Sequence, residues 1–205
     1  MRPFESLVSR AAWLAEDNID TDAILPARFL LLLDKSQFGL HLFHDRRHGG
    51  DGSPRPGFIL DSAEMHGAQI LLGCRNFGCG SSREHAVWAI AGHGIRVVIA
   101  ISFGDIFRAN CLKNGILPVS CSEEDHPALL AAAEAGTAFR VDLHDRIVVA
   151  GQFAFPILLA EEERDALLNG WDEIEHITSL HGRDIAAFEA AHRAAQPWLF
   201  LEEWL

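Results

Sequence analysis

The sequence predicts an α/β fold followed by a helical extension at the C-terminal end. Two observations indicate this class. β-Branched runs alternate with helix-like segments between residues 68 and 136, and the pattern is helical from Ala160 onwards. The chain has 205 residues, 49% of them hydrophobic, so it can bury a large core without disulfides. We therefore expect one domain over residues 1–205, with its core in 1–160 and the helical extension in 161–205.

The N-terminal arm is rich in turn-forming residues. The run Asn18-Ile-Asp-Thr-Asp22 stands directly ahead of the apolar Ala23–Leu25, and Pro26 precedes a short predicted helix. A loop follows at residues 46–57, where four glycines and two prolines forbid regular structure. This loop separates the arm from a central block.

The central block alternates strands with helices. Its expected strands are 68–73, 95–101 and 116–119, and its expected helices are 83–91, 104–114 and 125–135. Glycines mark the ends of these helices, at Gly92 or Gly94, Gly115 and Gly136. Two further strands are expected on either side of the polar turn 144–146. The C-terminal segment is expected to be helical to about Ala195, with breaks near Gly170 and Gly182.

Charge and hydropathy exclude several classes of protein. The net charge is −12 and the basic residues are scattered, whereas a nucleic-acid surface needs a basic stripe. The longest wholly apolar run, Phe29–Leu33, is far too short to cross a bilayer. The N-terminus lacks the apolar region of a signal peptide. We expect a cytoplasmic protein that binds neither nucleic acid nor membrane.

The four cysteines do not have the spacing of a metal site. Cys74, Cys79, Cys111 and Cys121 contain no Cys-x-x-Cys pair, and no histidine pair stands at the spacing of a zinc finger. Four cysteines are enough to hold an iron–sulfur cluster. However, Cys74 falls at a predicted strand end and Cys111 inside a predicted helix. We therefore expect free thiols and no metal ligands on this chain.

A glycine-rich loop between a predicted strand and a predicted helix carries the clearest chemical signal. In Phe77-Gly-Cys-Gly-Ser-Ser-Arg-Glu-His85, the glycines let the backbone turn tightly and approach a ligand. The first N–H groups of the following helix have no partner within the helix and attract anions. Arg83 adds a guanidinium that can grip a carboxylate with two hydrogen bonds. The loop therefore predicts a site for a small carboxylic acid or a phosphate.

Two interpretations of Ser81 stay open on local sequence. Ser81 and Glu84 have the spacing of a capping box, in which the serine only caps the helix, and the alternative is that Ser81 faces a ligand. Two other motifs are excluded. A P-loop needs a lysine that the loop lacks, and an esterase elbow needs a glycine where Arg83 stands. Asp20 and Asp22 are expected either to form a turn or to orient Arg83 or a partner chain.

Three motifs in order give the chain a specific resemblance. They are Asp17-Asn-Ile-Asp-Thr-Asp-Ala-Ile-Leu-Pro26, Asn76-Phe-Gly-Cys-Gly-Ser-Ser-Arg-Glu-His85 and Asp105-Ile-Phe-Arg-Ala-Asn-Cys-Leu-Lys-Asn-Gly-Ile-Leu-Pro118. With these motifs the chain resembles the small subunits of 3-isopropylmalate dehydratase over nearly its whole length. This family is the separate-chain counterpart of the mobile C-terminal domain of aconitase. The resemblance implies the swivelling three-layer β/β/α domain.

The resemblance also implies a division of roles. Ser81 would be the base that removes a proton next to a substrate carboxylate, and Gly80, Ser82 and Arg83 would bind substrate. A large subunit would carry a [4Fe–4S] cluster, with no cofactor on this chain, in a heterodimer or heterotetramer. The implied reaction converts 2-isopropylmalate to 3-isopropylmalate in leucine biosynthesis, by dehydration and rehydration of a small hydroxy-dicarboxylate.

The family reads the variable arm of the substrate with a segment that corresponds to Arg28–Asp34. Relatives that act on tricarboxylates have an arginine about where Leu31 stands, so Leu31 and Leu32 are expected to offer an apolar surface to an isopropyl group. A core role for the leucines is the alternative. Many bacterial small subunits have basic residues here, which leaves open a citraconate-, dimethylmalate- or homoaconitate-type dehydratase. A non-catalytic anion-binding module is the remaining alternative.

Overall fold

The structure is a computed structural model that describes residues 1–81 and 83–200. Ser82, one of the expected substrate contacts, lies outside the described residues. The chain divides into a first compact unit, Met1–Gly170, and a second unit that begins at Trp171. The expected single domain with a boundary at residue 160 stays a prediction.

A seven-stranded mixed sheet forms the centre of the first unit, in the order β4-β3-β2-β1-β5-β6-β7. The strands are β1 (Ser6–Trp13), β2 (Ile70–Leu72), β3 (Val97–Ala100), β4 (Leu117–Ser120), β5 (Ala138–Asp142), β6 (Ile147–Ala150) and β7 (Phe153–Pro156). The strands from β1 to β4 are parallel to one another, and β5, β6 and β7 add antiparallel pairs. β1 joins the two halves, because Ala11–Trp13 pairs with β2 while Ser6–Arg10 pairs with β5.

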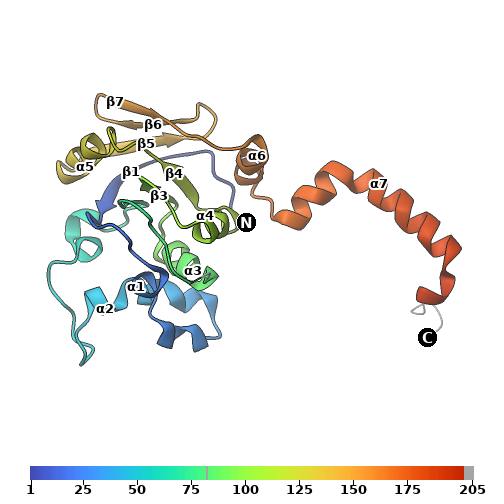
Figure 1. The fold of residues 1–205 in the computed structure, drawn as a ribbon, viewed down its shortest axis with the longest axis horizontal. Helices are drawn as coiled ribbons and strands as arrows, with labels where there is room; N and C mark the ends of the chain where they lie inside the picture. Colours follow the sequence, from blue (N-terminus) through green and yellow to red (C-terminus); the bar gives the residue numbers. More distant parts are fainter. Residues whose placement is uncertain (82, 201–205) are drawn as a thin grey trace. The chain divides into compact units, whose positions relative to one another are not determined.

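Both faces of the parallel strands are buried, which gives three layers. Leu71 and Val98 point into one core cluster, which includes side chains of α3 (Glu84–His93) and α4 (Asp105–Lys113). Their neighbours Ile70 and Val97 point into a second cluster with β5–β7, α5 (His126–Glu134) and α6 (Glu161–Asn169). Figure 1 shows α3 on one side of the parallel strands and β5–β7 with α5 on the other. The predicted β/β/α architecture is confirmed.

Most of the expected elements are present, with small shifts at their ends. Short helices α1 (Thr21–Ile24) and α2 (His44–Arg47) and several 3-10 turns occupy the N-terminal arm and the loop after it. The prediction omitted β1 and β7. The burial of β1 follows no strict alternation, since one half lies at the junction of two sheet halves. Its strand character therefore comes from partners that are distant in sequence.

The second unit contains one long helix, α7 (Glu173–Ala195). Asp172 and Glu175 form a capping box at its start, and no residue of the helix is buried. The expected break near Gly182 is wrong, because α7 runs through this glycine. A glycine inside a helix costs only about 1 kcal/mol, which the rest of a long helix can offset. In the part of the chain that is described, no helix has the length and apolarity needed to cross a bilayer.

Candidate active site

The predicted anion-binding loop connects β2 to α3, and its shape depends on glycine. Gly78 and Gly80 have φ angles of +72° and +89°, which side-chain-bearing residues rarely adopt. A Cβ atom on Gly78 would also lie 2.1 Å from Cγ of Phe107, so this glycine is required by packing as well. After these two turns the chain reaches Ser81, which is exposed, and Arg83, which is half-buried. Gly80, Ser81 and Arg83 are thus brought together at the start of α3.

The capping-box interpretation of Ser81 is wrong. α3 begins at Glu84, and its N-cap is Arg83, two residues after Ser81. The carboxylate of Glu84, which a capping box would use, instead accepts hydrogen bonds from Nδ2 of Asn114 (2.8 Å) and Nε1 of Trp88 (3.3 Å). Arg83 makes no side-chain cap. The serine therefore stands ahead of the helix and outside its N-cap.

The segment Asn18–Asp22 lies along the loop and holds it in place. Gly78 donates its N–H to the carbonyl of Ile19 (2.7 Å), and Thr21 donates its N–H to the carbonyl of Cys79 (3.0 Å). The hydroxyl of Thr21 donates to the carbonyl of Ser81 at 3.0 Å. The loop between β2 and α3, residues 73–83, is called the active loop below. One side of it is thus paired with the N-terminal arm almost residue by residue.

Asp22 and Arg83 form an ion pair at the end of this pairing. Nη1 of Arg83 donates to Oδ1 of Asp22. Asp20 has a different role, because its carboxylate accepts from the N–H of Ala23 (2.7 Å) and caps α1. Asp20 thus serves the local turn that precedes and caps α1, whereas Asp22 contacts Arg83. Sequence reasoning assigned no role to Thr21, although it stands inside the motif that carried the resemblance.

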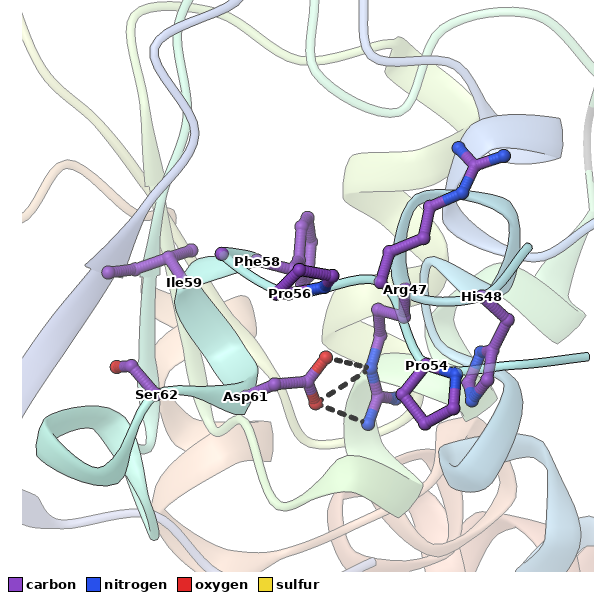
Figure 2. Close-up of a pocket in the computed structure, with 10 residues that line it drawn as sticks. Arg47, His48, Pro54, Pro56, Phe58, Ile59, Asp61 and Ser62 are labelled. Carbon is purple, nitrogen blue, oxygen red and sulfur yellow. Dashed lines mark hydrogen bonds and ion pairs between the residues drawn. The ribbon is translucent and has the colours of Figure 1, made fainter.

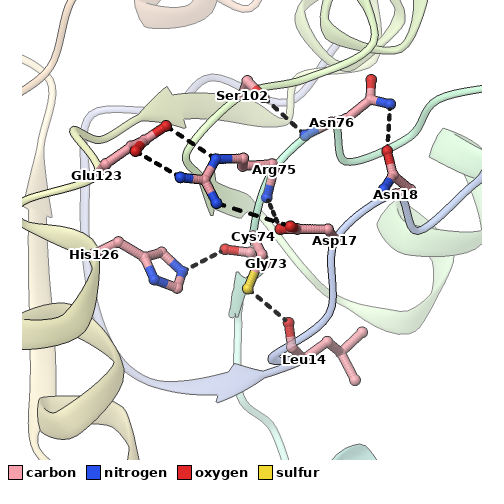
Figure 3. Close-up of polar contacts among 10 residues, drawn as sticks. All are labelled: Leu14, Asp17, Asn18, Gly73, Cys74, Arg75, Asn76, Ser102, Glu123 and His126. Atoms are coloured by element: carbon pink, nitrogen blue, oxygen red, sulfur yellow. Dashed lines mark hydrogen bonds and ion pairs between the residues drawn. The ribbon is translucent and has the colours of Figure 1, made fainter.

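Figure 3 shows how the other end of the loop is anchored. The side chain of Arg75 donates from Nε to the carboxylate of Glu123 (2.9 Å). The backbone N–H of Arg75 donates to the carboxylate of Asp17 (2.9 Å). Asn76 donates from its side-chain amide to Oδ1 of Asn18 at 2.8 Å. Arg75 is thus a structural residue that ties the base of the loop to the N-terminal arm and to the turn before α5.

Leu31 and Leu32 lie on a separate segment, at the end of a 3-10 turn (Ala27–Leu31). Leu31 is 87% exposed, so the alternative of a core role is wrong for this residue. Leu32 is half-buried and packs against the core cluster. The ring of Phe29 stacks on His41 with 3.9 Å between centroids, which anchors the turn. The segment therefore presents Leu31 to its surroundings rather than to the interior.

The cysteines do not form a site that fits a metal cluster. Among residues 1–81 and 83–200, no group of three or more His, Cys, Asp or Glu side chains is arranged to hold a metal ion. Burial raises the pKa of the Cys111 thiol strongly and the pKa of Cys121 to about 11. Burial therefore favours the protonated form of these two thiols.

A pocket of about 580 Å³ lies elsewhere, against the segment 47–62. Figure 2 shows Arg47 and Asp61 paired in its wall, with Nη2 and Oδ1 2.6 Å apart. Ser81 and Arg83 do not line this pocket. Because Ser81 is exposed, this chain does not by itself remove water from the serine.

Comparison with known proteins gives consistent matches along the chain. The family model for the aconitase C-terminal domain matches residues 1–124, and the model for the C-terminal domain of 3-isopropylmalate dehydratase small subunits matches residues 180–202. The 3-isopropylmalate dehydratase small subunit of Anaeromyxobacter dehalogenans is 46% identical over 94% of this chain and 100% of its own length. The small subunit of Geobacillus kaustophilus is 44% identical over 94% of this chain and 98% of its own.

A solved structure supports the same comparison. The crystal structure of 3-isopropylmalate dehydratase from Methanocaldococcus jannaschii superposes with a TM-score of 0.64 at 25% identity. The match covers 90% of this chain and 99% of that chain.

Proposed function

This chain belongs to the family of 3-isopropylmalate dehydratase small subunits, and we propose that its Ser81 loop is the small subunit's half of the active site. The enzyme is a hydro-lyase of leucine biosynthesis that interconverts 2-isopropylmalate and 3-isopropylmalate by dehydration and rehydration. The relatives do not favour the alternatives of another dehydratase or a non-catalytic module. We also propose that the enzyme works in the cytoplasm.

Ser81 is the proposed base that takes the proton from the carbon next to a carboxylate. A serine of ordinary pKa cannot do this unless its alkoxide is stabilised. The observation that supports the role most directly is its position: Ser81 precedes the N-terminus of α3, and the residue that could have engaged it in a capping box bonds elsewhere. Backbone N–H groups at a helix N-terminus and the charge of Arg83 favour the anion there.

Arg83, Ser82 and Gly80 are the proposed contacts of the substrate carboxylate. Asp22 contacts Nη1 of Arg83, so a second edge of the guanidinium, Nε with Nη2, has the geometry to receive a carboxylate. Gly80 has no side chain, which lets a ligand approach the backbone of the loop. Leu31 and Leu32 are proposed to contact the isopropyl arm from the neighbouring segment.

The other half of the site is proposed to come from the large subunit, in a heterodimer or heterotetramer. Ser81 is exposed, and a base needs a desolvated environment to remove such a proton. The large subunit is proposed to hold a [4Fe–4S] cluster, which would act as the Lewis acid for the departing hydroxyl. On this proposal the present chain supplies the base and the carboxylate contacts and carries no cofactor.

The proposal is tested by Ser81→Ala in the enzyme reconstituted with its large subunit. We expect turnover to fall by about 10³-fold or more, because a positioned base typically contributes 10²–10⁴-fold, while substrate still binds. Steady-state kinetics and calorimetric binding measure the two effects. Ser6→Ala is the control, since Ser6 is also an exposed serine but is the first residue of β1 and no part of the Ser81 loop. Near-normal turnover of Ser81→Ala would sink the assignment of the base.

A further inference from the structure

The ion pair between Asp22 and Arg83 is part of a continuous pairing between two segments. Asp20 and Cys79 form a parallel β-bridge, and Thr21 bonds to both Cys79 and Ser81. Asp22 is the next residue along, and it meets Arg83. The backbone on the N-terminal side of Asp22 is thus placed by the same contacts that shape the loop between β2 and α3.

The residues directly before Asp22 are held by specific contacts. Asp22 lies in the first turn of α1, which Asp20 caps. Thr21, directly before it, is only 2% exposed and is fixed through both its backbone N–H and its hydroxyl. An arginine side chain has many rotamers, and ordering it costs conformational entropy. A carboxylate fixed by the fold lowers that cost at the moment of substrate binding.

The ion pair leaves other N–H groups of the Arg83 guanidinium able to bind a ligand. The contact is between Nη1 and Oδ1, so it uses one N–H group of a guanidinium that has five. The Arg83 side chain is 25% exposed and that of Asp22 is 53% exposed, so the pair lies at the surface and not in the core. At such a site an ion pair adds little to stability.

We propose that Asp22 is a positioning residue, which orients the Arg83 guanidinium so that its other edge meets the substrate carboxylate. The proposal rests on the function of Arg83 proposed above. It concerns binding of the ground state and the transition state alike, because the carboxylate is present in both. Loss of Asp22 should therefore raise KM and leave kcat nearly unchanged.

Charge repulsion alone would change KM in the opposite direction when Asp22 is removed. Asp22 places a negative charge within a Debye length of a site for a dianionic substrate. If that charge acted only by repulsion, its removal would lower KM. A positioning role predicts that KM rises when the same charge is removed. The direction of the change in KM thus separates the two roles, and a purely structural role predicts neither.

The experiment uses the reconstituted two-subunit enzyme with 2-isopropylmalate as substrate. The variants are Asp22→Asn, Asp22→Glu, Arg83→Ala and the double variant. The control is Glu161→Gln, since Glu161 forms a comparably exposed ion pair with Arg146. We expect Asp22→Asn to raise KM about tenfold, as fits the loss of one charge-assisted hydrogen bond, with kcat within about threefold. Asp22→Glu should recover most of the loss, and Glu161→Gln should match the wild type.

The double variant shows whether Asp22 acts through the arginine. We expect the double variant to have the KM of Arg83→Ala alone, since two residues that act as a unit are not additive. Additive effects, an unchanged or lowered KM for Asp22→Asn, or weaker assembly with the large subunit in gel filtration would each overturn the positioning role. If Arg83→Ala itself keeps a normal KM, the proposed function of Arg83 fails, and the inference fails with it.

Discussion

At the scale of single residues, the contacts of Glu84 show that Ser81 and Glu84 do not form a capping box. Local sequence offered this carboxylate as the second half of a capping box, but in the folded chain it bonds to Asn114 and Trp88. These two residues come from α3 itself and from the end of α4, which packs beside it. A contact made 30 positions away along the chain thus removes the competing role of Ser81.

The proposed contact of Leu31 with the isopropyl arm depends on the exposure of its side chain. We expect Leu31→Arg to lower kcat/KM for isopropylmalate relative to a tricarboxylate by about tenfold or more, because an arginine favours a third carboxylate over an isopropyl group. Assays of the reconstituted enzyme with both substrates measure the ratio. The control is Leu33→Arg, since Leu33 is fully exposed on the same segment. An unchanged ratio for Leu31→Arg, or the same change in both variants, contradicts the proposed role.

At the scale of elements, an ion pair between side chains joins α6 to α4. α6 is tied to α4 by two hydrogen bonds between Arg108 and Glu163, at 2.7 and 2.9 Å. The side-chain hydrogen bonds from Arg108 lower the pKa of Glu163. A carboxylate with a lowered pKa in the folded state stabilises the fold above its unfolded pKa, and this contribution is lost as the pH falls through the folded pKa.

We therefore expect Glu163→Gln to be less stable than the wild type by about 1 kcal/mol at pH 7, as for a half-buried bidentate pair. The difference in free energy of unfolding should be constant above about pH 5 and shrink as the pH falls below 4, since an unfolded glutamate titrates near 4.3. Denaturant titrations at several pH values measure it. Glu162→Gln is the control, because Glu162 is exposed in the same helical turn. A difference that does not depend on pH contradicts the assignment.

Elements with a local signal were predicted and elements without one were not. The β-branched run of β3 indicated a strand, and the glycine after α3 indicated the end of that helix, since each pattern lies within a few residues. β1 and β7 were missed because their pairing partners supply much of their strand character. β1 begins at Ser6 and also contains Ser9 and Arg10, which give a weak strand signal by themselves.

At the scale of the whole molecule, the core is complete before α7 begins. Leu167, 1% exposed, is the last large apolar residue in the buried core of the described chain, and its carbonyl accepts from the N–H of Phe4 (2.9 Å). No residue between Trp171 and Phe200 is buried. The first unit thus carries the sheet, both core clusters and the active loop.

A chain that ends after Gly170 is expected to fold with a Tm within about 3 °C of the full chain. A chain that ends after Ala160 loses α6 and the burial of Leu167, and its Tm should fall by about 10 °C or more, since losing a buried leucine side chain alone costs about 2–5 kcal/mol. Circular dichroism during thermal unfolding compares the two. Equal Tm values for both truncations would favour the boundary at residue 160 that the sequence predicts.

The sequence by itself determined the family, the α/β class and the loop that carries Ser81 and Arg83. These rest on glycines, strand runs and motifs, whose information lies within a few neighbouring residues. Only the tertiary structure decided that Ser81 is not a helix cap, that Leu31 is exposed, and that Thr21 and Asp22 hold the active loop. The first depends on the contact of Glu84 with Asn114, 30 positions away, and the last on contacts about 60 positions apart, Thr21 with Ser81 and Asp22 with Arg83. No local pattern encodes such contacts, because the folding of the intervening chain brings the two segments together.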